Sequence, residues 1–187
     1  MKLSIVTTLY YSAPYLQEFY ARIKQAAETI TDDYEIILVN DGSPDQSLET
    51  AVFLYNHDPH VKVIDLSRNF GHHKAAMTGL AHAVGELVFQ IDVDLEEEPE
   101  LLTKFYEIFE ASDADAVYGV QDKRKGGLVE RATGWLFYTV FNLLSVLHRT
   151  KILLAKSSRC RRIFQANANR AKCDVRVSCI GTSRSAS

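Results

Sequence analysis

Residues 86–94 have the sequence Glu86-Leu-Val-Phe-Gln-Ile-Asp92-Val-Asp94, in which an apolar run ends in two carboxylates. The run predicts a buried strand and places Asp92 and Asp94 at the strand's carboxyl end. Open α/β sheets bind ligands at that end, and two neighbouring carboxylates attract a hard divalent cation. An acidic turn before a helix is the alternative, because Glu96 and the glutamates after it suit a helix N-terminus. Asp-x-Asp alone does not separate these two interpretations.

Strands and helices are predicted to alternate along the chain up to residue 120. Ser43 to Gln46 match a capping box with Pro44 at the first helical position. The strands are too continuously apolar for a half-exposed sheet, so we predict an α/β fold with a Rossmann-like, mostly parallel sheet and helices on both faces. The hydrophobic spacing indicates strands at residues 3–8, 34–40, 61–66, 86–92 and 114–120, and helices at 15–30, 44–55, 72–84 and 99–111.

The loops after the first, second and fourth strands are expected to meet at one edge of this sheet. Right-handed crossovers and ligand binding at the carboxyl ends of the strands both lead to that arrangement. Asp41 also fits a simple turn and helix cap, because Gly42, Ser43 and Pro44 follow it. The polar residues that these loops bring to the edge are Thr7, Thr8, Asp41, Asp92 and Asp94.

The composition is that of one folded domain with an uneven distribution of charge. The chain has 187 residues, of which 47% are hydrophobic and 24% charged, and its net charge is -3. Up to Leu147 there are 11 basic and 23 acidic residues, whereas from His148 onward there are 10 basic residues and one acidic residue. The cysteines, Cys160, Cys173 and Cys179, match no zinc or redox motif. We expect no nucleic-acid partner.

No membrane-spanning helix is expected in this chain. The longest apolar stretch, from Trp135 to Leu147, has 13 residues, and a membrane span needs about 20. Met1-Lys2 leads directly into the first strand with no pattern of a secretory signal, which predicts a cytoplasmic location. The aromatic residues of the Trp135 stretch follow a basic loop, so this stretch is either an interfacial helix on anionic lipid or a core helix of the same domain.

Several motifs, taken together and in this order, resemble the inverting family 2 glycosyltransferases with the GT-A fold, and within them the polyprenyl-phosphate sugar transferases. The resemblance covers Leu3 to about Leu144, so residues 1–147 are predicted to be an incomplete catalytic domain. Residues 148–187 are predicted to be an unmatched basic tail, either an out-of-frame translation or a segment that binds anionic lipid. The motifs are Ser4-Ile-Val-Thr-Thr8, Leu38-Val-Asn-Asp-Gly-Ser43, Ser67-Arg-Asn-Phe-Gly-His72, Ile91-Asp-Val-Asp-Leu95 and Tyr118-Gly-Val120.

The resemblance implies a donor, a cofactor and an acceptor. The donor would be a nucleotide-diphosphate sugar of the UDP or GDP type, bound with Mg²⁺ or Mn²⁺. The acceptor would be a polyprenyl phosphate or a glycan, met by a peripheral enzyme at the inner membrane surface. Family members commonly have glutamine where Glu96 stands, so Glu96 either strengthens the metal site or caps the next helix.

The resemblance also implies roles for individual residues. No chemistry is assigned to His72 and His73, which are expected to be surface or helix-start residues. The implied roles are donor binding for Thr7, Thr8, Asp41, Arg68 and Asp92, metal binding for Asp92, Asp94 and Glu96, and catalysis for Asp94, Arg124 and Arg131, the arginines belonging to a basic loop that grips phosphates.

Three activities remain open from the sequence. The first is an active glycosyltransferase, and the second is a donor-binding fragment without turnover, because the acceptor side of the family is missing. The third is a sugar nucleotidyltransferase, which also joins an α/β sheet to a metal and a nucleotide. The third class has a glycine-rich loop near its amino end, whereas this chain has no glycine before Gly42.

Overall fold

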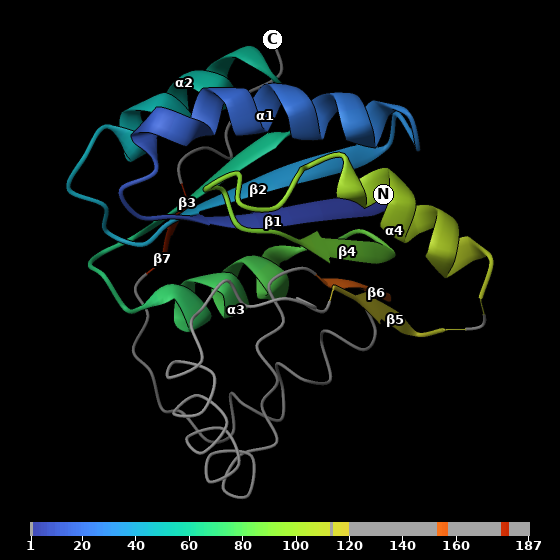
Figure 1. Cartoon of the computed structure of the whole chain (residues 1–187). Coiled ribbons are helices and arrows are strands. Elements are labelled where there is room, and N and C mark those ends of the chain that lie inside the picture. Colours follow the sequence, from blue (N-terminus) through green and yellow to red (C-terminus); the bar gives the residue numbers. More distant parts are fainter. Residues whose placement is uncertain (1, 113, 120–152, 157–176, 180–187) are drawn as a thin grey trace, which may run out of the picture.

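The computed structural model describes residues 2–112, 114–119, 153–156 and 177–179. A central sheet has the strand order β5-β6-β4-β1-β2-β3-β7, with the four strands β4, β1, β2 and β3 parallel to one another (Figure 1). The elements are β1 (Leu3–Leu9), α1 (Ala13–Glu28), β2 (Tyr34–Asn40), α2 (Ser47–His57), β3 (Val61–Leu66), α3 (His72–His82), β4 (Leu87–Gln90), α4 (Leu101–Glu110), β5 (Ala116–Tyr118), β6 (Leu153–Lys156) and β7 (Val177–Cys179).

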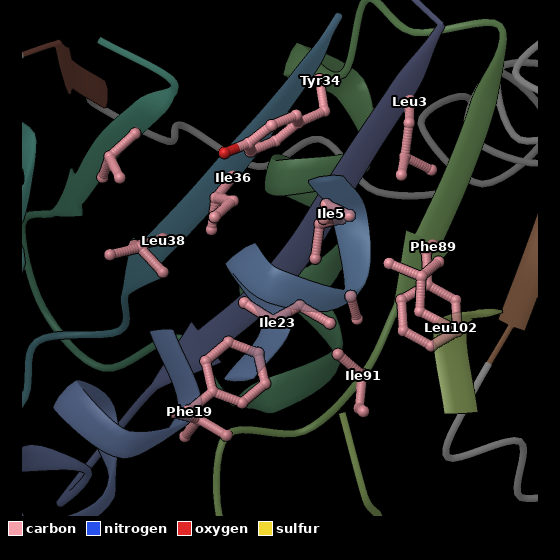
Figure 2. Close-up of a cluster of buried hydrophobic side chains, with 14 of the residues drawn as sticks. Leu3, Ile5, Phe19, Ile23, Tyr34, Ile36, Leu38, Phe89, Ile91 and Leu102 are labelled. Atoms are coloured by element: carbon pink, nitrogen blue, oxygen red, sulfur yellow. The ribbon is translucent and has the colours of Figure 1, made fainter. Parts of the chain in front are cut away.

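Helices cover both faces of the parallel strands, as the continuous apolar strands predict. Alternate residues of a strand point to opposite faces, so Ile5 packs into the cluster under α1, α2 and α4, whereas Val6 packs into the cluster under α3. Figure 2 shows the larger cluster, which brings Phe19 and Ile23 of α1 together with Ile5 of β1 and Ile36 of β2. The predicted α/β fold is therefore confirmed.

The helix α3 lies unusually close to the sheet because of a glycine. A Cβ atom added to Gly79 would lie 2.4 Å from Val6 Cγ1 and 2.9 Å from Val39 Cγ2, so only a residue without a side chain fits between α3 and strands β1 and β2. Glycine inside a helix costs about 1 kcal/mol relative to alanine. The close approach fixes α3, and with it the residues at its amino end, against the centre of the sheet.

The predicted start of α2 is wrong. The helix begins at Ser47 rather than at Pro44 and continues to His57. Asp45 Oδ1 accepts hydrogen bonds from the Ser47 backbone N–H at 3.1 Å and from Ser47 Oγ at 2.5 Å, and Ser43 Oγ also donates to Asp45 at 2.6 Å. This turn, made by an aspartate with the backbone two residues later, replaces the predicted capping box and keeps Pro44 outside the helix.

The structure also contains two strands that the sequence analysis did not predict. β6 lies between β4 and β5 and is antiparallel to both, and Leu154 in its middle is buried in the larger cluster. β7 pairs antiparallel with β3. Both strands fall within the predicted tail of residues 148–187, so parts of that segment belong to the sheet.

A buried aspartate stabilises the amino edge of the sheet. Asp58, whose side chain is 4% exposed, accepts hydrogen bonds from Lys24 Nζ at 2.7 Å, Tyr20 Oη at 2.5 Å and the His60 backbone N–H at 2.8 Å. Burial alone would raise the pKa of Asp58, but these hydrogen bonds outweigh it and hold the pKa below its ordinary value of 3.8. The charged form of Asp58 is therefore favoured by folding.

We expect Asp58→Asn to lower the free energy of unfolding by about 2 kcal/mol at pH 7, because charge-assisted hydrogen bonds are lost. Since the folded pKa is depressed, the contribution is complete above the unfolded pKa near 3.8 and is lost as the pH falls through the folded pKa. Denaturant unfolding should therefore show a difference in the free energy of unfolding between parent and variant, and this difference should become smaller below pH 4. Asp32→Asn, at an exposed position, is the control. A free-energy difference that does not change with pH would contradict this role of the charged Asp58 carboxylate.

Candidate functional site

The carboxyl ends of the four parallel strands carry four loops with unusual backbone conformations. Each loop contains one residue with a positive φ angle, and these are all the residues with positive φ in the described part of the chain. Two of them are not glycine, which costs each about 1–2 kcal/mol, and such strain gathers at functional sites. The residues are Tyr11 (φ 53°) after β1, Gly42 (62°) after β2, Gly71 (95°) after β3 and Leu95 (59°) after β4.

Hydrogen bonds join these loops to one another. The Tyr11 backbone N–H donates to Ser43 Oγ at 2.8 Å, which ties the β1 loop to the β2 loop. Asp41, only 2% exposed, accepts hydrogen bonds from the backbone N–H groups of Phe70 at 2.7 Å and Gly71 at 3.0 Å. The β2 loop is thereby tied to the β3 loop. The sequence predicted Asp41 as a donor-binding residue or a turn residue, and the structure adds this contact between loops.

The β2 and β3 loops also pack directly against each other. A Cβ atom on Gly42 would lie 2.5 Å from the backbone nitrogen of Asn69, so no larger residue fits there. The exposed Arg68 lies with its guanidinium carbon 4.6 Å from the centre of the Phe70 ring, a cation–π contact that holds the arginine on the loop surface. Arg68 is therefore at the predicted edge of the sheet.

The order of the strands changes direction between β1 and β4, which is where doubly wound sheets bind ligands. Three polar side chains meet at this point. Thr8, near the end of β1, has its Oγ1 3.0 Å from Nδ1 of His72, the first residue of α3. Nε2 of the same histidine lies 3.7 Å from Oδ1 of Asp92, which follows β4. The predicted residues Thr8 and Asp92 are thus joined through a histidine that the sequence analysis left without a role.

Asp94 is exposed and belongs to a tight turn after Asp92. Its Oδ1 accepts a hydrogen bond from the Glu96 backbone N–H at 3.1 Å, across the strained Leu95. Glu96 is exposed as well, and it is its backbone N–H that contacts Asp94. The turn directs two carboxylates of one short segment to the carboxyl edge of the sheet.

Asp45 connects the loops after β1 and β2 by hydrogen bonds. It accepts hydrogen bonds from the backbone N–H of Ala13, at the start of α1, and from the side chains of Ser43 and Ser47. Burial would raise the pKa of Asp45, but these hydrogen bonds outweigh it and lower the pKa to about 2. The carboxylate is therefore charged at neutral pH and joins the amino ends of α1 and α2 beneath the site.

Some predicted site residues are not part of the cluster formed by Thr8, His72 and Asp92. Thr7 is 1% exposed and points to the opposite face of the sheet from Thr8, and its hydroxyl has no hydrogen-bond partner among the described residues. The alternation of side chains along β1 is the reason, because neighbouring residues of a strand face opposite sides. Arg124 and Arg131, together with the aromatic stretch from Trp135, lie outside the described residues.

The carboxylates of Asp92 and Asp94 suit a hard divalent ion that takes its remaining ligands from water and from the substrate. No group of three potential metal ligands occurs among the residues that the structure describes. In nucleotide sites Mg²⁺ needs fewer than three protein ligands, because one or two carboxylates hold it and phosphate oxygens and water complete its coordination. The pair Asp92 and Asp94, which follows β4, has the chemistry of such a donor set.

Comparison with known proteins decides the family. The family model described as glycosyl transferase family 2 matches residues 4–179, which is nearly the whole chain. The chain belongs to glycosyl transferase family 2. This match confirms the family that the sequence motifs predicted.

The relatives of this family 2 chain are longer proteins. A glycosyltransferase-class protein of Mycobacterium tuberculosis is 56% identical over 144 residues, which cover 77% of the chain and 42% of that relative. The bactoprenol glucosyl transferase of Shigella phage SfV is 33% identical over 146 residues, which cover 78% of the chain and 47% of that relative. The chain therefore spans less than half the length of these curated relatives.

A solved structure supports the fold. A mannosyltransferase from Pyrobaculum calidifontis, solved in complex with GDP-Man and Mn²⁺, matches with a TM-score of 0.63 and 20% sequence identity. The match covers 87% of this family 2 chain and 46% of the mannosyltransferase chain. The GT-A type of α/β fold predicted from the motifs is thereby confirmed. Within the described residues, no helix has the length and apolar character to cross a membrane.

Proposed function

We propose that the chain is an inverting glycosyltransferase that moves a sugar from a nucleotide diphosphate to a polyprenyl phosphate. The observation that carries the proposal is the cluster of Asp92, His72 and Thr8 at the point where the strand order reverses, with Asp94 two residues beyond. The relatives named bactoprenol glucosyl transferase support a glucosyl donor and a polyprenyl acceptor.

The residues of this chain would have different roles in binding the donor and the metal. Asp92 and Asp94 would hold Mg²⁺ or Mn²⁺, which when bound neutralises negative charge on the leaving diphosphate. Thr8 and Arg68 would contact the nucleotide from the first and third loops. Asp41 holds the loop after β3 in place by accepting hydrogen bonds from Phe70 and Gly71. Its carboxylate would also contact the nucleobase. Arg124 and Arg131 would grip phosphate groups.

The acceptor proposal has a chemical reason. A phosphate monoester has a second pKa near 6 and is therefore anionic at neutral pH. Its oxygen can attack the anomeric carbon of the sugar, from the face opposite the leaving diphosphate, without a strong general base. The C–O bond to the diphosphate then breaks and the configuration at that carbon is inverted. A hydroxyl acceptor would instead need a base to take its proton.

Transfer of radiolabelled glucose from UDP-glucose tests this proposal, with GDP-mannose as the alternative donor. With Mn²⁺, the full chain is expected to release nucleoside diphosphate and to label short-chain polyprenyl phosphate but not the matching polyprenol. Binding of the donor without transfer would instead favour a donor-binding fragment without turnover. Release of pyrophosphate would favour a nucleotidyltransferase, and transfer to the polyprenol would contradict the proposed acceptor.

A further inference from the structure

We propose that His72 is a positioning residue, which holds the Asp92 carboxylate in place for metal binding and is itself held by Thr8. The proposal rests on the proposed metal-dependent donor site and names a residue that the family motifs left without a role. The geometry has three links: Thr8 Oγ1 to His72 Nδ1 at 3.0 Å, one imidazole ring, and His72 Nε2 to Asp92 Oδ1 at 3.7 Å.

The two ring nitrogens of His72 have different tasks in this arrangement. A ring that carries its proton on Nε2 presents an N–H to Asp92 and can accept the hydroxyl hydrogen of Thr8 at Nδ1. The 3.7 Å separation is longer than a direct hydrogen bond, so the contact is an electrostatic attraction between a polar N–H and a carboxylate. Groups that orient a metal-binding carboxylate in this way set metal affinity.

The backbone around His72 is fixed independently of its side chain. Gly71 precedes α3 with φ at 95°, and its N–H donates to Asp41 at 3.0 Å, so the entry into the helix is held by the second loop. Gly79 brings the same helix close to Val6 on β1. The imidazole therefore starts from a fixed backbone position between β1 and β4, which is what a positioning role requires.

Neighbouring His73 provides a matched control. It is exposed like His72 and contacts that ring edge-on, with ring centres 5.5 Å apart. The contacts with Thr8 and Asp92 are made by His72. Replacing either histidine removes one imidazole from the same helix turn. Only the loss of His72 should change the orientation of Asp92.

The test is a titration of Mn²⁺ into the full chain, followed by the electron paramagnetic resonance signal of the free ion, with UDP present. His72→Asn keeps an amide near the Nδ1 position but cannot reach Asp92, and we expect it to weaken Mn²⁺ binding about tenfold. His72→Gln, whose amide reaches the Nε2 position, should recover most of the affinity. His73→Asn should bind like the parent, and the melting temperatures without metal should be alike.

A double-mutant cycle separates positioning from direct binding by Thr8. Thr8→Val alone should weaken Mn²⁺ binding, but it should add little in the His72→Asn background, because the link to Asp92 is already broken. Full additivity of the two changes would overturn the proposal, as would parent-like binding by His72→Asn or an equal loss in His73→Asn. If the parent binds Mn²⁺ and His72→Asn matches it, the proposed donor site stands and only this inference fails; a parent that binds no Mn²⁺ overturns both.

Discussion

Asp94→Ala is expected to weaken the Mn²⁺-dependent binding of a nucleotide sugar by about a hundredfold, equivalent to about 2.8 kcal/mol. The two carboxylates after β4 are the protein's proposed share of the metal shell, so removing one leaves the ion with a single protein ligand from this pair. Asp94 is exposed and lies in a turn, so the fold should be unaffected. Calorimetric titration of UDP-glucose and GDP-mannose, with Mn²⁺ or with EDTA, measures the effect.

Glu98→Ala is the matched control for this experiment. Glu98 is an exposed carboxylate four residues after Asp94 and in the same acidic run, so the change in net charge is identical. We expect it to bind nucleotide sugars like the parent. Equal affinity of the parent and Asp94→Ala in the presence of Mn²⁺ would remove Asp94 from the metal site.

The second large effect is expected at the opposite edge of the sheet, where Glu35 is 1% exposed. Its carboxylate accepts hydrogen bonds from Ser4 Oγ at 2.5 Å and from the Val84 backbone N–H at 2.9 Å, and it lies 2.5 Å from Lys62 Nζ. It thereby links β1, β2, β3 and the segment before β4. Removing one member of such a buried group leaves the others without partners, which costs about 3–5 kcal/mol.

We therefore expect Glu35→Ala to lower the free energy of unfolding by about 3 kcal/mol, since Lys62 is half exposed and recovers part of its hydration. Glu35→Gln keeps an oxygen that can accept from Ser4 and Val84 and should lose less. Denaturant unfolding of both variants measures this. If glutamine and alanine destabilise equally, the ion pair rather than the hydrogen bonds holds this edge together. If neither destabilises, the group has no role in stability.

The layered fold could be predicted because its signals are local. Each parallel strand is an apolar run followed by a helix with one apolar face, and continuous apolar strands occur where helices cover both sides of a sheet. β6 has no such signal. Its residues, Leu153–Lys156, stand in a basic segment, and their place in the sheet depends on pairing with β4, more than 60 positions earlier in the chain.

The site was predictable at the level of loops but not of contacts. Thr8 and Asp92 follow strand patterns, whereas the bonds from Asp41 to Phe70 and Gly71 join residues about 30 positions apart with no signal in either segment. The burial of Thr7 could have been foreseen, because neighbouring strand residues face opposite sides. His72 also had a signal, because it directly follows Gly71 at a predicted helix start and is the last residue of a family motif.

The location of the metal site can be measured directly by Mn²⁺-induced broadening of backbone amide signals in the nuclear magnetic resonance spectrum of the full chain with UDP-glucose. The ion's unpaired electrons broaden signals only from nearby nuclei. We expect the signals of Thr8, His72 and Asp92 to disappear first, while those of Glu35 and Lys62 at the opposite edge persist. Broadening centred on the opposite edge, or no selective broadening anywhere, would contradict a metal-dependent donor site at the carboxyl ends of β1 and β4.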